Sequence, residues 1–536
     1  MDGTRARRFW GWGYEDEGPT RAQQRSMAGT LESRFGLAEL TVTDPPTLAE
    51  IDLRTPRLDP PPTLAEICRT DTEARAGHTY GKSFRDIVRG YARDFSHPPD
   101  VVAYPRDEAD VVAVLDWCND AGAAAIPYGG GSSVVGGVEC DVGDAYSGVV
   151  SVDLAGLGRV VEIDRTSRAA RIQAGVYGPA LEDQLRPHDL TLRHFPQSFE
   201  FSTLGGWIAT RSGGHYATLY THIDDFVEGL RVVTPQGVLE SRRLPGSGAG
   251  PSPDRMFCGS EGILGVITEA WMRLQDRPTF RSSATARFST FEAGVDAARA
   301  VSQSGLHPAN CRLIDATEAG LTGAGDGSAH LLLLAFESAD HPLDAWLERA
   351  VECARDHDGD VDDARSSARE PGREGAAGTW RNAFIRAPYT RDALVGLGLV
   401  NETFETACTW EQFPALYDGV MAATRGALRS IGADPAVVTC RFTHVYPDGP
   451  APYFTVIAPG AAEPGVRLEQ WATVKTAAAD ALIAHGGTIT HHHSVGRDHR
   501  RWYDRQRPDL FADALRAAKA TLDPAGILNP GVLIDP

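Results

Sequence analysis

The sequence lacks the patterns that would tie it to a bilayer or to export. No run approaches the roughly 20 apolar residues needed to span a membrane. The N-terminus MDGTRARRFWGWGYED carries arginines with no apolar segment after them, so no signal peptide is predicted. The C-terminus GVLIDP does not match the peroxisomal signal S-K-L. We therefore expect a cytoplasmic protein.

Paired cysteines and positive charge are also scarce. The 8 cysteines are scattered without a CxxC pair, which argues against a disulfide framework and a structural zinc site. The formal net charge of −20 argues against a nucleic-acid partner and against bulk attraction to an anionic membrane. At 536 residues the chain is too long for one hydrophobic core, so two or three domains are expected.

Changes in composition and hydrophobic pattern along the chain suggest where these domains begin. Residues 1–95 are polar and Pro-rich, and we expect an N-terminal helical region there. A near-repeat, DPPTLAEI at 44–51 and PPPTLAEI at 60–67, predicts two capped helix starts. From 96 to 278, short β-rich runs alternate with helical ones, among them a helix over 107–122, which indicates a ligand-binding α/β domain.

The C-terminal half has a different pattern. Residues 279–500 mix strands with Ala-rich helices, which predicts a second, substrate-binding domain. Residues 501–536 read as a helix followed by a turn-rich end. We expect this last segment to pack back on the first domain.

A glycine-rich loop, IPYGGGSSVVGG at 126–137, directly follows a predicted strand. Consecutive glycines let the backbone approach a ligand and turn its N–H groups toward an anion, and the two serines add hydroxyl donors. It is not a Walker loop, because Gly137 stands where lysine is needed. The dinucleotide fingerprint G-x-G-x-x-G fails as well, because Val134 occupies the third glycine position.

Three further stretches follow this loop, at 195–214, 224–240 and 259–270. In order and spacing the four together resemble the FAD-binding domain of the vanillyl-alcohol-oxidase (PCMH-type) flavoprotein superfamily. The resemblance implies an α+β protein: a PCMH-type FAD-binding domain of two α/β subdomains, plus a cap domain with an antiparallel sheet flanked by helices.

The same resemblance assigns the cofactor contacts. In such domains backbone donors of the first loop hold the FAD pyrophosphate, and the later segments surround the ribityl chain and the ring. We expect non-covalent FAD, because His215, the candidate for a covalent tether, lies outside the first loop. The residues assigned to FAD are Pro127, Tyr128, Gly129, Gly130, Gly131, Ser132, Ser133, Pro196, Gln197, Ser198, Phe199, Glu200, Phe201, Ser202, Ala209, Thr210, Arg211, Ser212, Ser260, Glu261, Gly262, Ile263, Leu264, Gly265 and Val266.

Motifs along nearly the whole chain restrict the resemblance from the superfamily to one family. WGWGYEDEG, EFSTLGGWIATRSGG, NCRLID, AFIRAPY, TFETACTW, CRFTHVYPDGPAPYF, THHHSVG and DPAGILNPG occur in an order that resembles the alkylglycerone-phosphate synthase (alkyldihydroxyacetonephosphate synthase) family. That family exchanges the acyl group of 1-acyl-dihydroxyacetone phosphate for a fatty alcohol without net oxidation. A transient adduct at flavin N5 is proposed for it. The resemblance implies ether lipid synthesis, lipid-like substrates, peripheral membrane contact and a homodimer.

Three residues take their expected roles from this family. Tyr453 occupies the position of the catalytic tyrosine, although a lone strand tyrosine is by base rate more often a core residue. Arg386 in AFIRAPY matches the arginine that binds the acyl carboxylate, and the planar guanidinium suits bidentate binding of a carboxylate. Arg312 in NCRLID matches a second arginine, which is expected to support the site.

The histidine triplet His491, His492 and His493 is expected to form an acid/base and phosphate-facing cluster. We prefer His493 for the chemistry, since histidine titrates near neutral pH. Two departures from the family pattern stand nearby: Ser494 replaces a glycine, and YFTV at 453–456 replaces YFYF. Both leave room for a different chain length or acceptor.

The alternative function is a FAD-dependent D-2-hydroxyacid dehydrogenase or oxidase of the glycolate, D-lactate or D-2-hydroxyglutarate type. That group binds a divalent metal through two histidines and a glutamate. His444 keeps the first histidine, but Tyr453 stands near the second, and His492 replaces the glutamate. Adjacent histidines in an extended segment also point to alternate faces. We therefore predict no metal. A non-catalytic flavin-binding protein is a third hypothesis.

Overall fold

A small sheet of three parallel strands and one antiparallel edge strand forms the core of the first lobe of the computed structural model, which describes residues 5–220, 222–361, 365–367 and 375–535. Its strands β1 (Cys68–Arg69), β2 (Val101–Ala103), β3 (Ala124–Tyr128) and β4 (Val149–Asp153) lie in the order β1-β2-β4-β3. Helix α4 (Glu108–Ala121) connects β2 to β3. Asp107 caps its first turn, and Gly122 ends it with φ 62°, so the predicted β-α-β unit is confirmed.

An antiparallel sheet packs beside the parallel one. Its order is β5-β6-β10-β8-β9, and its buried side chains pack with Trp207 and Ile208. Its strands are β5 (Val160–Asp164), β6 (Ala169–Gln173), β8 (Val227–Thr234), β9 (Gly237–Glu240) and β10 (Val266–Arg273). The short elements around it are α5 (Gly178–Leu185), β7 (Leu190–Thr191), α6 (Leu204–Thr210), α7 (Ala217–Tyr220), α8 (Ile223–Phe226), α9 (Pro253–Phe257) and β11 (Gln275–Asp276).

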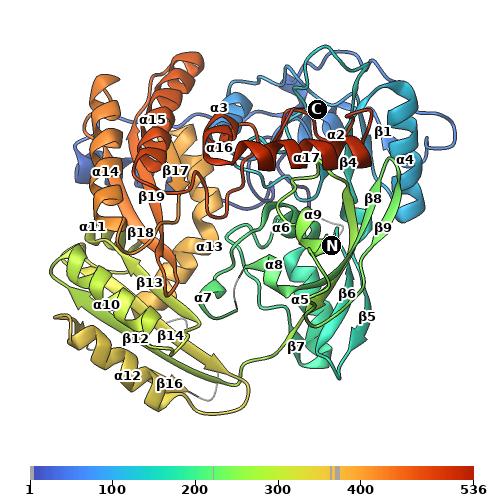
Figure 1. The fold of residues 1–536 in the computed structure, drawn as a ribbon. Helices are drawn as coiled ribbons and strands as arrows, with labels where there is room; N and C mark the ends of the chain where they lie inside the picture. The colour runs from blue at the N-terminus through green and yellow to red at the C-terminus, as the bar shows by residue number, and fades with distance from the viewer. Residues whose placement is uncertain (1–4, 221, 362–364, 368–374, 536) are drawn as a thin grey trace.

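The second lobe is a large antiparallel sheet of order β15-β12-β14-β13-β18-β19-β17, with β16 also paired to β12 (Figure 1). Its strands are β12 (Phe280–Phe288), β13 (Asn310–Ile314), β14 (His330–Ser338), β15 (Asp360–Val361), β16 (Arg365–Ser367), β17 (Leu399–Glu405), β18 (Val437–Val445) and β19 (Pro450–Pro459). One face is covered by α10 (Phe291–Gln303), α12 (Asp344–Arg355), α14 (Phe413–Ser430) and α15 (Pro464–Ala484). The opposite face is partly covered by α11 (Ala316–Thr322) and α13 (Gly375–Gly396).

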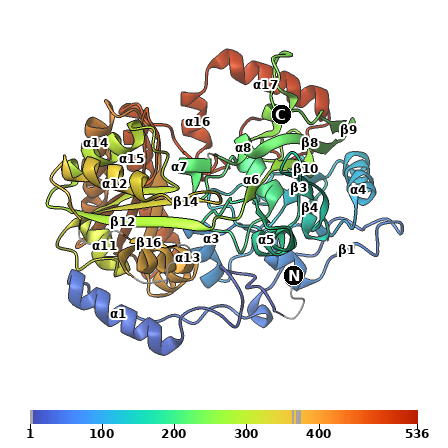
Figure 2. The same ribbon diagram turned by 90° about the horizontal axis from the view of Figure 1, so that it is seen from below.

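The N-terminal segment reaches both lobes. Helix α1 (Arg21–Phe35) lies along the second lobe (Figure 2), and α2 (Thr72–Gly77) and α3 (Phe84–Tyr91) follow it along the chain. The first copy of the near-repeat forms a capped 3-10 turn at Leu48–Glu50, as predicted. The second copy forms successive turns and no helix: the amides of Leu64 and Ile67 donate to the carbonyls three residues earlier, and both side chains are buried.

The C-terminal segment returns to the first lobe. Helices α16 (Arg500–Gln506) and α17 (Asp509–Leu522) cross between the lobes (Figure 1). Beyond them, the amide of Ala125 in β3 donates to the Ile527 carbonyl, and the amide of Asn529 donates to the Ala125 carbonyl. The expected α+β class is confirmed. In the described part of the chain, no helix has both the length and the apolar character to cross a membrane.

Candidate functional site

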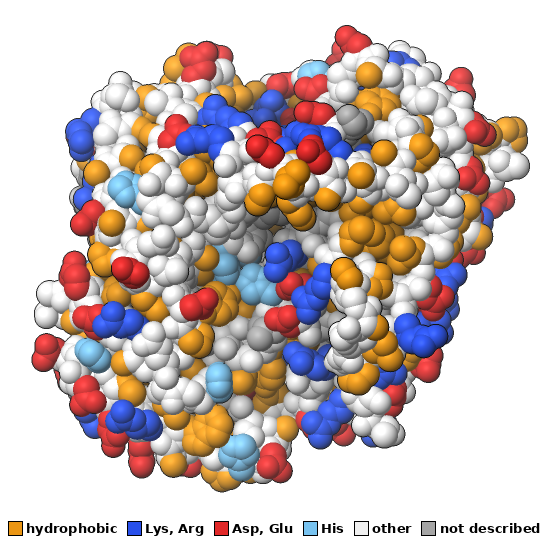
Figure 3. Space-filling view, viewed as in Figure 1, with side chains coloured by type: hydrophobic (Ala, Val, Ile, Leu, Met, Phe, Trp, Pro, Cys, Tyr) orange, Lys and Arg blue, Asp and Glu red, His pale blue; other side chains and the backbone are white. Residues whose placement is uncertain are grey.

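A cavity of about 860 Å³ opens between the two lobes. In Figure 3 it is the hollow at the centre of the molecule, with histidine and basic side chains near its rim. Its walls come from the loop after β3, the segment before α6, the exposed face of β17 to β19, and helices α13 and α1. This volume is in the range of cofactor and ligand pockets.

The glycine-rich loop forms the nucleotide-side wall and fits a cofactor pyrophosphate. A Cβ on Gly130 would stand 1.7 Å from the Phe201 carbonyl oxygen, and Gly131 has φ +66°, so side chains are excluded at both positions. Among the described residues, no protein group accepts a hydrogen bond from the backbone N–H groups of 129–134. A row of free N–H donors after a parallel strand is an anion-binding arrangement, which suits the phosphates of FAD.

Many residues assigned to FAD by resemblance line this cavity. All seven of the first loop do so, and the others are Pro196, Gln197, Ser198, Ser202, Ala209, Thr210, Ser212, Glu261, Gly262 and Gly265. Eight more do not line it, because neighbouring residues in a segment point in different directions. Phe201, Ile263, Leu264 and Val266 are packed in hydrophobic cores. The remaining four are Phe199, Glu200, Arg211 and Ser260.

The catalytic tyrosine candidate stands in a cross-strand row. Tyr453 on β19 pairs with Arg441 on β18 and with Glu405 on β17. Directly opposed residues share a face of the sheet, so all three side chains lie at one level. The Tyr453 ring is 4% exposed and lies in the cavity wall. Its centroid is 6.1 Å from the His492 ring and 5.5 Å from the His493 ring.

Glu405 holds the histidine triplet in place. Its fully buried carboxylate accepts hydrogen bonds from the Thr490 hydroxyl at 2.7 Å and from the backbone N–H groups of His491, His492 and His493. Burial alone would raise its pKa, but the charge that His492 and His493 carry when they are protonated in acid, together with these hydrogen bonds, lowers it to about 2. The carboxylate is therefore ionised at neutral pH and fixes the loop by its backbone.

A second carboxylate holds the loop from the other lobe. Glu261 accepts the amides of Val495 and Gly496, each at 2.8 Å. Burial raises the pKa of Glu261 to about 7. Ser494 has φ +69°, in the region that favours glycine, which accounts physically for a glycine at this position in the family pattern.

The three histidines do not play equivalent parts. His492 and His493 line the cavity, whereas His491 lies behind them, outside the cavity wall. The Nε2 of His491 is hydrogen-bonded to the Tyr446 hydroxyl at 2.9 Å and to the Nε2 of His222 at 3.1 Å. Its Nδ1 meets the Nδ1 of His492 at 2.9 Å. His491 therefore supports His492 from behind.

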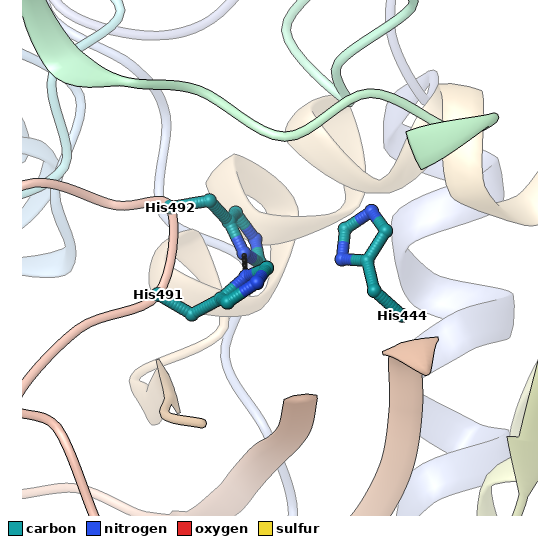
Figure 4. Close-up of side chains that lie close together, drawn as sticks. All are labelled: His444, His491 and His492. Atoms are coloured by element: carbon teal, nitrogen blue, oxygen red, sulfur yellow. Dashed lines mark hydrogen bonds between the residues drawn. The ribbon is translucent and has the colours of Figure 1, made fainter. Parts of the chain in front are cut away.

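His444 completes this group. Figure 4 shows its ring facing the His491 and His492 pair, while its Nε2 donates to the Gly214 carbonyl at 2.8 Å. Within the described residues, two sets each offer ligand atoms within 4.8 Å of one another: His444 with His491 and His492, and Glu405 with His492 and His493. Neither set contains all three members of the triplet. That the site works without a metal stays a prediction.

The imidazoles of this group are neutral at pH 7. Burial lowers the pKa of His492, and it lowers the pKa values of His444, His491 and His493 well below the ordinary value. Titration near neutral pH, the reason for preferring His493 on sequence alone, is therefore wrong for the resting site. Neutral imidazoles can accept a proton or donate one N–H, but they bring no charge to a phosphate.

The two arginines occupy different environments. Arg312 on β13 is 2% exposed and donates to the Thr443 carbonyl at 3.2 Å. Burial, and then Arg441, lower its pKa to about 9, so it stays charged at neutral pH. Arg386 on α13 lines the opposite wall and is exposed to the cavity, with its guanidinium 5.8 Å from the Tyr389 ring.

Sequence reasoning missed Glu405, Arg441 and Trp12. Glu405 and Arg441 lie within the quoted motifs TFETACTW and CRFTHVYPDGPAPYF, but only strand register brings them beside Tyr453. Trp12, in the opening motif, lines the cavity, and its amide donates to the Asp392 carboxylate on α13 at 2.8 Å. A charged residue inside a strand motif was the available signal for the first two.

Two family models cover the lobes that meet at this cavity. Residues 99–241 match the FAD binding domain, and residues 277–533 match the C-terminal domain of FAD linked oxidases. The fold and site therefore define an FAD-dependent protein of the FAD-linked oxidase class, and the prediction of FAD is confirmed.

Individual relatives identify the family within this class. The alkyldihydroxyacetonephosphate synthase of Trypanosoma brucei brucei is 30% identical over 487 residues, covering 87% of this chain and 78% of that protein. The Dictyostelium discoideum enzyme of the same name is 31% identical, covering 88% and 79%. A solved structure of an alkyldihydroxyacetonephosphate synthase is 25% identical, covers 98% of both chains and has a TM-score of 0.82. The chain belongs to the alkyldihydroxyacetonephosphate synthase family and is an FAD-dependent enzyme of this type.

Proposed function

We propose that the protein replaces the acyl group of 1-acyl-dihydroxyacetone phosphate with a fatty alcohol, giving the 1-alkyl product used for ether lipids. The observation that carries this proposal is the placement of Tyr453, His492, His493 and Arg386 around one cavity that also contains the free N–H groups of the glycine loop. When bound there, FAD supplies the isoalloxazine ring beside which the exchange at C1 takes place.

The protein groups account for each proton and charge. Arg386 binds the carboxylate of the acyl group, which leaves as the C1–O bond breaks. Tyr453 takes a proton from C1 and returns it. The entering alcohol loses its hydroxyl proton to a neutral imidazole of His492 or His493, and its oxygen forms the new bond to C1. The released acid and the ether together balance the two substrates, so no oxidant is consumed.

The first test is alcohol-dependent release of fatty acid. Labelled acyl-dihydroxyacetone phosphate should release its fatty acid only when a fatty alcohol is present. Release of fatty acid without alcohol, or no release when alcohol is present, would contradict the proposed exchange reaction. Non-covalent FAD, a homodimer and peripheral contact with the membrane that supplies both lipids belong to the same proposal.

The competing function is tested with the flavin itself. Glycolate, D-lactate and D-2-hydroxyglutarate, added without oxygen, should leave the flavin oxidised if the protein is a transferase. Rapid bleaching by one of them would instead support the hydroxyacid dehydrogenase. The carboxylate Glu405, held by four protein donors and ionised, is committed to the loop, which disfavours its use as a metal ligand.

A further inference from the structure

We propose that residues 8–17, which we call the N-terminal strap, are a positioning element that fixes helix α13 so that Arg386 can bind the acyl carboxylate. The inference rests on the proposed function for the role of Arg386. It goes beyond that function by assigning the placement of the carboxylate site to a distant part of the chain. It also gives a role to the opening motif WGWGYEDEG, which takes no part in the exchange chemistry.

The N-terminal strap is bonded to α13 at two side chains on neighbouring turns. The Trp12 amide donates to the Asp392 carboxylate at 2.8 Å, and the Arg8 guanidinium pairs with the same oxygen at 3.3 Å. The Tyr389 hydroxyl donates to the Glu17 carboxylate at 2.6 Å. Tyr389 and Asp392 are both buried, so the loss of these partners would leave polar groups of α13 unsatisfied.

Two glycines of the strap leave room for the same two side chains. A Cβ on Gly13 would stand 2.2 Å from the Tyr389 ring, and a Cβ on Gly11 would stand 2.5 Å from the Asp392 carboxylate. Gly13 also has φ +80°, in the region that favours glycine. The glycines of the motif are therefore explained by the close approach of α13.

The other side of the strap contacts the first lobe. The Trp12 indole N–H donates to the Lys82 carbonyl at 3.1 Å. The Trp12 and Tyr389 rings both meet the Phe201 ring edge-on, with centroids 6.0 and 5.8 Å apart. Phe201 lies in one of the segments assigned to FAD. The strap therefore joins α13 to the wall of the cavity that faces the cofactor.

Arg386 lies one turn before Tyr389 on α13. Its guanidinium stands 5.8 Å from the centroid of the Tyr389 ring, within the range of a cation–π contact. Pro388, between them, has no amide to donate to the Phe384 carbonyl, which accepts instead from the Gln197 side chain at 3.2 Å. The helix thus lacks one internal hydrogen bond next to Arg386, and side-chain contacts such as that with Tyr389 fix its direction there.

The test compares binding of dodecanoate and dodecanol to the FAD-loaded protein, read from the change that each causes in the flavin absorbance spectrum. Gly13→Ala places a methyl group against the Tyr389 ring and displaces it. We expect the Kd of dodecanoate to rise about 10- to 100-fold, as for the loss of a charge-assisted hydrogen bond. The Kd of dodecanol should stay unchanged, because only the carboxylate needs the guanidinium of Arg386.

The matched control is Gly36→Ala. Gly36 also has a left-handed backbone, with φ +63°, but its added Cβ meets nothing within 4 Å. This variant carries the same kind of backbone strain, and both dissociation constants should stay unchanged. If Gly13→Ala does not fold, Tyr389→Phe carries the test, because it keeps the ring and loses only the hydrogen bond to Glu17. There the Kd of dodecanoate should rise about 2- to 10-fold.

The outcomes separate this inference from the proposed function. An unchanged Kd of dodecanoate in the folded, FAD-loaded variants would overturn the positioning role, and so would an unaltered protein that binds no dodecanoate. Equal weakening of dodecanoate and dodecanol would leave the strap a role in stability alone. If only dodecanoate binding weakens but the unaltered protein performs no exchange, the proposed function fails while the strap still positions a carboxylate site.

Discussion

Tyr453 and Glu405 are directly opposed on neighbouring antiparallel strands, so the tyrosine and the anchor of the histidine loop share one level of the sheet. The loop reaches this level from residues more than eighty positions away in sequence, through hydrogen bonds to the Glu405 carboxylate. The spacing between Tyr453 and the histidine loop is therefore set by β-sheet register, and a slip of one residue would destroy this spacing.

Tyr453→Phe should abolish exchange while FAD stays bound. The phenol is the group placed for proton removal, and its loss is expected to lower kcat by about 10²- to 10⁴-fold. Flavin content and thermal midpoint should match the unaltered protein, because the ring remains in the wall. Full activity in Tyr453→Phe would assign the proton transfer elsewhere.

Glu405→Gln should release the histidine loop and remove a pH dependence of stability. The folded pKa of Glu405 lies below its ordinary 4.5, at about 2, so its stabilisation is present above about pH 4.5 and is lost as pH falls toward 2. This difference between the ordinary and the folded pKa corresponds to a free energy of unfolding of about 3 kcal/mol at most. Denaturant unfolding at pH 7 and at pH 3 measures it.

The control for that experiment is Glu469→Gln, an exposed position on α15. Its unfolding free energy should follow that of the unaltered protein at both pH values. If Glu405→Gln lost as much unfolding free energy between pH 7 and pH 3 as the unaltered protein, the Glu405 carboxylate would not be the acid-sensitive group that holds the histidine loop.

Arg386→Lys should weaken binding of the acyl substrate more than it slows turnover. Lysine keeps the charge but loses the bidentate fork, and one charge-assisted hydrogen bond corresponds to about 10- to 100-fold in affinity. Steady-state KM for the acyl substrate measures the effect, with KM for the alcohol as internal reference. Arg425→Lys, exposed on α14, is the matched surface control; equal KM values in both variants would argue against carboxylate binding by Arg386.

Gly130→Ala should prevent FAD binding. The new methyl group would stand 1.7 Å from the Phe201 carbonyl, so the loop must move and its N–H groups with it. Flavin absorbance after purification and the affinity of the apoprotein for added FAD report the loss. Gly248→Ala, whose added Cβ meets nothing within 4 Å, should bind FAD normally. Stoichiometric flavin in Gly130→Ala would contradict the assigned cradle.

Local signals predicted local structure well. Asp107 and Gly122 bound α4 because each acts within one helical turn, and the glycine loop follows β3 as expected. The helix start predicted for the second copy of the near-repeat is wrong, since its amides bond three residues back in successive turns. The FAD contacts assigned to whole segments stay a prediction, although the side chains of Phe201 and Ile263 pack in hydrophobic cores.

The long-range parts of the site could not be predicted from the chain alone. The stacking of Arg441 on Tyr453, and the joining of Glu405 and Glu261 to a single loop, depend on strand register and on how the lobes meet. The neutral state of the histidines follows from burial, which no motif records. Sequence resemblance therefore identified the family, while the contacts that tune the site required coordinates.

The segment around Leu528 completes the edge of β3 from a distant part of the sequence. It bridges to Ala125 in β3, and the Asn529 side chain donates to the carbonyls of Gly137 and Glu261, on either side of the cofactor cavity. During synthesis, some four hundred residues must leave the ribosome after β3 before this edge can close. This edge of the cofactor cavity is therefore completed by residues that are synthesised long after β3 itself.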